Sequence, residues 1–274
     1  MEKTPVRISH RVETPAGQTG ELVRPPGYHG GSAFPGGYPR DSAPSQARAL
    51  ATRQFRTMVS NVETILGWAT PNEVKAGRDW YPTANDHARR IGRLAGHKNR
   101  EDAIHAGSGV IAALSPMTEW DENLINAHSM AKTGIPQNEP PQQAQDKARS
   151  ILLGGDPEDH VVKPGRPQNK TYHFYRNIKD PSDPHFVTID RHAHDATMGH
   201  VMVGNDRGLE QPGRYRKFTD VYALAGSRAG ISLPNQAQAQ AWGTWKRVKG
   251  GKSAQSNFDD YLKSVGDYDS YYSL

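Results

Sequence analysis

Lys170 and Asp190 are the two residues of this sequence whose types and spacing most clearly suggest chemistry. Lys170 follows a turn marked by Pro164 and Gly165, and it opens a run, KTYHFYRNI, of helical character. The backbone N–H groups and the dipole of such a helix start suit an anion such as a phosphate. The apolar run 186–189 then leads to Asp190, 20 residues after Lys170 (190 − 170). The spacing predicts an amine and a carboxylate beside a phosphate site.

A structural interpretation of the same two residues is also open. Lys170 would then be a solvated residue in the first turn of its helix, and Asp190 would cap the helix that begins at RHAHD. Both interpretations require a helix start at each residue. They differ in whether the two helix starts open into one cleft.

The elements that must position these residues are helices, because apolar residues recur at helical spacing from Ala47 onward. Gly134 is expected to close one helix, and Pro234 is expected to start the last long one. Alternating strand patterns are nearly absent, so the predicted fold is all-α. The segments expected to be helical are 47–70, 83–96, 100–116, 119–134, 144–155, 170–178, 191–204, 215–230 and 234–248.

The chain is expected to have three parts. Residues 1–45 are rich in Gly, Pro, Ser and Arg without a hydrophobic period, which predicts a flexible arm. Residues 46–250 form the helical domain. Residues 251–274 are a tail with one or two amphipathic turns.

Composition narrows the classes of partner and cofactor. The 274 residues include no cysteine, which excludes disulfides, thiolate metal sites and iron–sulfur clusters. The formal net charge of +5 favours a polyanion such as DNA. The sequence shows neither a secretory signal nor a run of about 20 apolar residues, so we expect a cytoplasmic protein that does not enter the membrane. We further expect a monomer without cofactor or metal.

Around Lys170 and Asp190 the chain resembles the helix-hairpin-helix DNA glycosylase superfamily, the group of endonuclease III and 8-oxoguanine glycosylase. The resemblance covers about residues 105–205 and rests on Pro164-Gly165, Lys170-Thr171 and Ile189-Asp190-Arg191-His192. The hairpin is one residue longer than the usual Gly-x-Gly-x-Lys and lacks its second glycine, and no four-cysteine cluster follows. The chain also resembles proteins of actinobacterial phages, which would place it in the host cytoplasm.

The resemblance implies cleavage of an N-glycosidic bond in DNA. Asp190 would stabilise positive charge on the sugar as the base leaves, and Lys170 would attack the sugar carbon as a free amine, giving lyase activity. The target base would flip out of the duplex into a pocket. The residues expected to contact the DNA backbone are Gly165, Arg166, Asn169, Thr171, Arg191 and His192. The residues expected to line the base pocket are Trp120, Asn123, Tyr172 and Tyr175.

Other functions are open. A base-exchange enzyme of a phage would use the same Asp190, and a noncatalytic DNA-binding protein would need only the phosphate site. A metal-dependent nuclease would use the histidines and aspartates of one short segment, which are Asp190, His192, His194, Asp195 and His200.

The last long helix has two expected roles. One of its faces should close the core, and the basic run that follows is either a phosphate contact or a solvated surface. The face is formed by Gln238, Ala241, Trp242 and Trp245, and the basic run by Lys246, Arg247, Lys249 and Lys252.

Overall fold

The computed structural model describes Leu22 and residues 52–162, 169–204, 206–211, 213–250 and 257–274. Within these ranges the regular secondary structure is entirely helical, which confirms the all-α prediction. The chain divides into two compact units. Unit 1 comprises Met1–Trp80 and Pro184–Gly251, and unit 2 comprises Tyr81–Asp183 and Lys252–Leu274. Unit 2 therefore combines residues of the expected helical domain with the expected tail.

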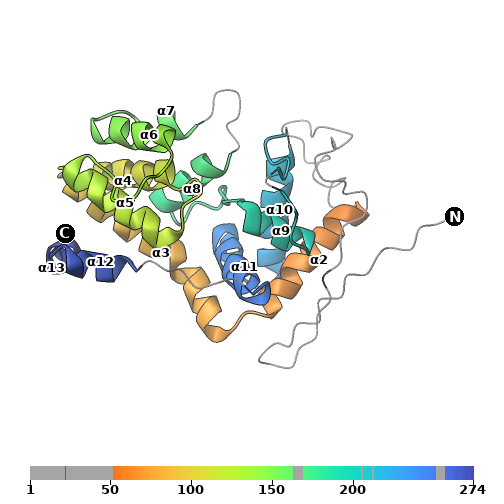
Figure 1. The fold of residues 1–274 in the computed structure, drawn as a ribbon. Helices are drawn as coiled ribbons and strands as arrows, with labels where there is room; N and C mark the ends of the chain where they lie inside the picture. Colours follow the sequence, from red (N-terminus) through yellow and green to blue (C-terminus); the bar gives the residue numbers. More distant parts are fainter. Residues whose placement is uncertain (1–21, 23–51, 163–168, 205, 212, 251–256) are drawn as a thin grey trace. The chain divides into compact units, whose positions relative to one another are not determined.

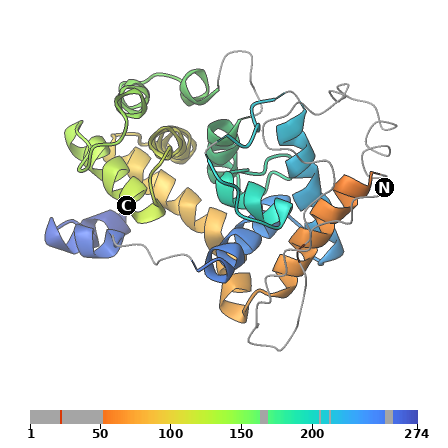
Figure 2. The same cartoon turned by 45° about the vertical axis from the view of Figure 1, so that its right-hand side comes forward.

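Unit 1 is a helical cluster around α2 (Arg53–Gly67). Helices α2, α10 and α11 contact one another pairwise and lie side by side in both views (Figure 1, Figure 2). The short helix α9 contacts all three of them. The other helices of the unit are α9 (Arg191–Met198), α10 (Arg214–Arg228), α11 (Pro234–Val248) and the first part of α3 (Pro71–Leu94).

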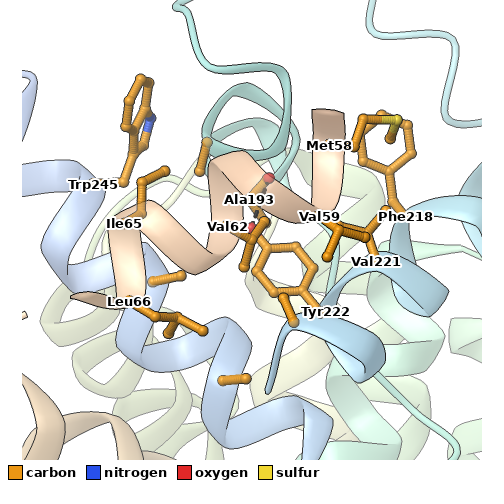
Figure 3. Packing of buried hydrophobic residues seen from close by; sticks show 14 of the residues in the cluster. Met58, Val59, Val62, Ile65, Leu66, Ala193, Phe218, Val221, Tyr222 and Trp245 are labelled. Atoms are coloured by element: carbon orange, nitrogen blue, oxygen red, sulfur yellow. Dashed lines mark hydrogen bonds between the residues drawn. The ribbon is translucent and has the colours of Figure 1, made fainter. Parts of the chain in front are cut away.

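The core of unit 1 forms where the apolar faces of these helices meet (Figure 3). Val62 and Ile65 of α2 point toward Tyr222 of α10 and Trp245 of α11, and all four are buried. Leu22, a residue of the predicted flexible arm, is also buried in this core. Burial of this apolar surface is the main stabilising contribution to the unit.

Two tyrosines of α10 hold the segment that leads into α9. The Tyr215 hydroxyl accepts from the backbone N–H of Ile189 at 2.9 Å and donates to the carbonyl of Val187 at 3.1 Å. The Tyr222 hydroxyl donates to the carbonyl of Ala193 at 2.8 Å. These bonds give a segment without a strand partner fixed backbone positions on both sides of residue 190.

Unit 2 is arranged around α4 (Arg100–Leu114), which contacts α5, α6, α7 and α8 (Figure 1). Its glycines allow a close approach to α3, because a Cβ at Gly107 would overlap the carbonyl oxygen of Ala88. The other helices of unit 2 are α5 (Trp120–Thr133), α6 (Gln142–Leu152), α7 (Pro157–Val161), α8 (Lys170–Lys179), α12 (Phe258–Ser264), α13 (Tyr268–Ser273) and the remainder of α3.

One helix boundary differs clearly from its prediction. Helix α3 begins at Pro71, not at Thr83, and it contains Pro82. A reciprocal capping box explains the early start: the backbone N–H of Thr70 donates to Glu73 Oε2 at 2.8 Å, and that of Glu73 donates to the Thr70 hydroxyl at 3.3 Å. A proline usually ends a helix, but here the helix continues through it. Residues 257–274 form two helices where one or two turns were expected.

Candidate nucleic-acid interface

Asp190 is the N-cap of α9 in unit 1. Its Oδ1 accepts from the backbone N–H of Ala193 at 2.7 Å, which satisfies one of the free donors at the helix start. The backbone before it is extended, and the buried residues Val187 and Ile189 anchor this segment in the core. The local sequence, an apolar run followed by Asp and a helix, therefore fixes the carboxylate at the edge of the core.

The second oxygen of the same carboxylate is held from α11. The indole Nε1–H of Trp242 donates to Asp190 Oδ2 at 3.0 Å. The Trp242 ring also meets the ring of His192 edge to face, with centroids 6.2 Å apart. Both carboxylate oxygens thus have an N–H donor from the protein, which fixes the orientation of the carboxylate.

Three cations lie beside Trp242 and His192, the two side chains next to this carboxylate. The ammonium group of Lys246 lies 4.4 Å from the centroid of the Trp242 ring, in a cation–π arrangement. Lys249 follows α11 as its C-cap, and Arg191 is the exposed first residue of α9. Asp195 also acts on Lys249 but is paired with Arg207, so Asp190 and the three cations leave an excess of positive charge, which suits a phosphate-bearing ligand.

His192 lies between two of these cations. Its Nδ1 is 2.8 Å from Nζ of Lys249, and its Nε2 is 3.3 Å from Nε of Arg191. Burial lowers the pKa of His192, and the charges of Lys249, Arg191 and Lys246 lower it further, whereas Asp190 opposes them. The pKa of Lys249 is lowered by its partial burial and by Arg191. The site therefore favours a neutral imidazole at neutral pH.

The other predicted catalytic residue belongs to unit 2. Lys170 is the first residue of α8, as the sequence predicts, and Asn169 is the N-cap that accepts from the backbone N–H of Tyr172 at 3.0 Å. Thr171 is half-buried in the same turn. Gly165 and Arg166 lie outside the described residues. The structure thus supplies the expected helix start at Lys170, while Asp190 is in unit 1.

The residues expected to line a base pocket all lie in unit 2. Asn123 is 2% exposed, and its amide donates to the carbonyl of Ile111 at 3.0 Å. Tyr175 is fully buried, and its hydroxyl lies 2.7 Å from Nδ1 of His105. These two side chains are interior residues that tie α4 to its neighbours.

Trp120 and Tyr172 are more accessible than the other two. Trp120 begins α5 and meets the rings of His87 and Phe174 edge to face. Tyr172 stacks on Tyr175, with centroids 6.3 Å apart. Both rings are half-buried, so part of each ring is exposed to solvent.

His194 and Asp195, two residues of the predicted metal site, bind each other and other protein groups instead. His194 is buried against Phe218, and its Nδ1 lies 3.0 Å from Asp195, which is also paired with Arg207 at 2.9 Å. This pairing occupies the carboxylate that a metal would need. Within the described ranges, no group of three His, Cys, Asp or Glu side chains could hold a metal ion.

The basic run after α11 separates into distinct roles. Arg247 pairs with Glu73 at 2.7 Å and donates to the carbonyl of Trp68, so it holds α11 to the start of α3 within unit 1. Lys252 lies outside the described residues. Lys246 and Lys249 belong to the Asp190 site.

Trp242, which the sequence assigned to the core, contacts Asp190. It is half-buried, whereas Trp245 is buried in the core as predicted. One signal in the sequence distinguishes Trp242 from Trp245: Lys246 follows Trp242 by four residues on the same helix face, where its ammonium group can lie over the ring.

Residues 44–249 match a family described as "Family of unknown function (DUF7178)", and the chain belongs to this family. No curated protein and no solved structure matches the chain. None of the described helices has the length and apolarity needed to cross a membrane.

Proposed function

We propose that this member of the DUF7178 family is a DNA glycosylase-like enzyme in which Asp190 is the catalytic carboxylate. The observation that carries the proposal is the environment of Asp190. A carboxylate fixed by the Ala193 N–H and the Trp242 indole lies among cations on α9 and α11. The arrangement combines an oriented negative charge with phosphate-binding groups.

The chemistry follows from the charge that develops as the bond breaks. When the C1′–N bond of a flipped nucleotide breaks, the electron pair leaves with the base and positive charge grows on the sugar. A fixed carboxylate stabilises that charge more strongly in the transition state than in the ground state. Water then adds to the sugar carbon and loses a proton. In a reaction with lyase activity, an amine adds in place of water and loses a proton, and the C1′–O4′ bond opens to give a Schiff base; Lys170 is the amine that the sequence predicts for this role.

The phosphate contacts have a separate role. Arg191, Lys246 and Lys249 would hold the phosphates beside the target nucleotide, which positions the sugar but conveys no base preference. Exchange of the base, rather than hydrolysis, would use the same carboxylate with a second nucleobase in place of water.

A noncatalytic DNA-binding protein is the second candidate. The observation that favours it is that both oxygens of Asp190 already accept hydrogen bonds within the protein, as they would in a purely structural cap. Such a protein would keep its cationic residues and release no base.

Incubation of the protein with end-labelled DNA that carries normal, damaged and phage-type bases distinguishes the candidates. The glycosylase proposal expects release of at least one base, and borohydride should trap a covalent adduct if Lys170 attacks the sugar. Lys170→Gln should abolish the adduct. DNA binding without release of any base would support the second candidate, and exchange would require incorporation of a labelled free nucleobase.

A further inference from the structure

His192 has a cation as the neighbour of each ring nitrogen. Lys249 Nζ is 2.8 Å from Nδ1, and Arg191 Nε is 3.3 Å from Nε2. An ammonium group and a guanidinium group are both donors, but a neutral imidazole can accept at only one nitrogen. The guanidinium N–H of Arg191 donates to Nε2, so in the neutral ring the proton is on Nδ1 and faces the Lys249 ammonium. The ring is therefore in electrostatic conflict with at least one neighbour.

The charged groups that face His192 come from two helices. Asp190 and Arg191 belong to the start of α9, and Lys246 and Lys249 belong to the end of α11. Among the described residues whose charges act on the ring, Asp190 is the one that favours its protonation. Because that carboxylate is already bonded to Trp242 and Ala193, it compensates the three cations only in part.

A bound phosphate would reverse this balance. Its negative charge would neutralise Arg191 and Lys249 and would accept a hydrogen bond from a protonated imidazole. From this geometry we propose that His192, Arg191, Lys246 and Lys249 form a phosphate site whose occupation is coupled to the protonation of His192. The identification of the ligand as a DNA phosphate rests on the proposed function, whereas the phosphate site itself does not.

Linkage gives the sign of the effect. If phosphate binding favours the protonated ring, protonation must strengthen phosphate binding by the same factor. The affinity for DNA should rise as the pH falls through the histidine range, from about 7.5 to about 6. Coupling of the usual strength predicts a gain of roughly tenfold.

Isothermal titration calorimetry of the wild-type protein tests the proposal without a variant. Short duplex DNA is titrated near pH 7 in two buffers with different ionisation enthalpies, and the difference in observed heat gives the protons taken up. The expected result is an uptake of about half a proton per site, which is the most that a tenfold coupling gives. Binding without proton uptake, at an affinity that does not change with pH, would overturn the proposal.

A pair of variants assigns the proton to one residue. His192→Gln keeps an acceptor but cannot titrate, so its binding should lose the pH dependence. His200→Gln is the matched control, because His200 follows the opposite end of α9, where its Nδ1 is 2.9 Å from the carbonyl of Met198. The control should keep the wild-type dependence. If His192→Gln also keeps it, His192 is not the coupled group.

Pyrophosphate serves as the second probe. Binding of pyrophosphate with proton uptake, together with no binding of DNA, would support the phosphate site and reject its assignment to DNA. Failure of both ligands to bind would reject the phosphate site itself.

Discussion

The indole N–H of Trp242 donates to the carboxylate of Asp190 over 3.0 Å and links α11 to the start of α9. The two residues are 52 positions apart in the sequence. The bond fixes the oxygen that the helix cap leaves unused. In the proposed mechanism, the bond from Trp242 fixes the orientation of the carboxylate toward the sugar.

Replacement of Trp242 by Phe removes the indole N–H and retains an aromatic ring. We expect base release to fall roughly tenfold, because one hydrogen bond that orients a charged group contributes about 1.4 kcal/mol. The measurement is single-turnover release of the base, with DNA affinity measured in parallel by fluorescence anisotropy. An unchanged rate would mean that the bond does not position the carboxylate for catalysis.

Trp245→Phe is the control for this experiment. Trp245 lies on the same helix, and its indole N–H is buried with no hydrogen-bond partner among the described residues. Loss of an unsatisfied buried donor does not cost a hydrogen bond. The Trp245 variant should therefore keep the wild-type rate of base release.

Tyr215→Phe should loosen the segment that leads to Asp190. The change removes the hydroxyl that bonds to both Val187 and Ile189, so the free energy of unfolding should fall by about 1–3 kcal/mol. Urea unfolding measures the loss. The half-buried Tyr268 provides a comparison, since Tyr268→Phe should change stability by no more than about 0.5 kcal/mol. Equal effects of the two changes would contradict a specific role of Tyr215.

Gly107→Ala should destabilise unit 2. An added Cβ would overlap the carbonyl oxygen of Ala88, so α3 and α4 would have to separate, at a cost of roughly 1–3 kcal/mol or more. Gly243→Ala is the matched control in another helix, because nothing lies within 4 Å of an added Cβ there. Better helix propensity should make that variant more stable by about 1 kcal/mol. Thermal unfolding measures both changes, and a Gly107 variant as stable as the wild type would rule out the close helix approach.

The helix ends that could be predicted from the sequence are those set by residues close together in the chain. Gly134 ends α5 in a left-handed conformation and Pro234 starts α11, as predicted, because caps depend on a few adjacent residues. The predicted start at residue 83 overlooks the capping box of Thr70 and Glu73, which starts α3 at Pro71.

The candidate site was predictable only in its local parts. The positions of Asp190 and Lys170 at helix starts follow from the turn and apolar residues that precede them. The bond from Trp242 joins helices far apart in the sequence and depends on how α9 packs on α11. No pattern in the sequence identifies which indole will meet which carboxylate.

Acid should destabilise unit 2 through His87. Burial lowers the pKa of His87 to about 4, and its ring packs against Phe258 and Tyr271. The unfolded chain binds this proton near pH 6.5, so stability is lost as the pH falls from about 6.5 to about 4, by up to about 3 kcal/mol. The measurement is urea unfolding of the wild type and of His87→Gln across this range. The stability difference between them should shrink on acidification, and a constant difference would contradict the assignment.

Asp190→Asn, assayed for base release at matched DNA occupancy, tests the central claim most directly. Asparagine caps a helix as well as aspartate does, so the fold and DNA binding should be retained. Its NH2 group cannot accept from Trp242, so Trp242→Phe measures the part of the effect that comes from this lost bond. Loss of the negative charge should lower base release by about a hundredfold or more. The charge control is Asp206→Asn, an exposed position of the same unit, which should release base at the wild-type rate. Base release by Asp190→Asn at the wild-type rate, or no release by the wild type from any substrate in the panel, would contradict a catalytic role of Asp190.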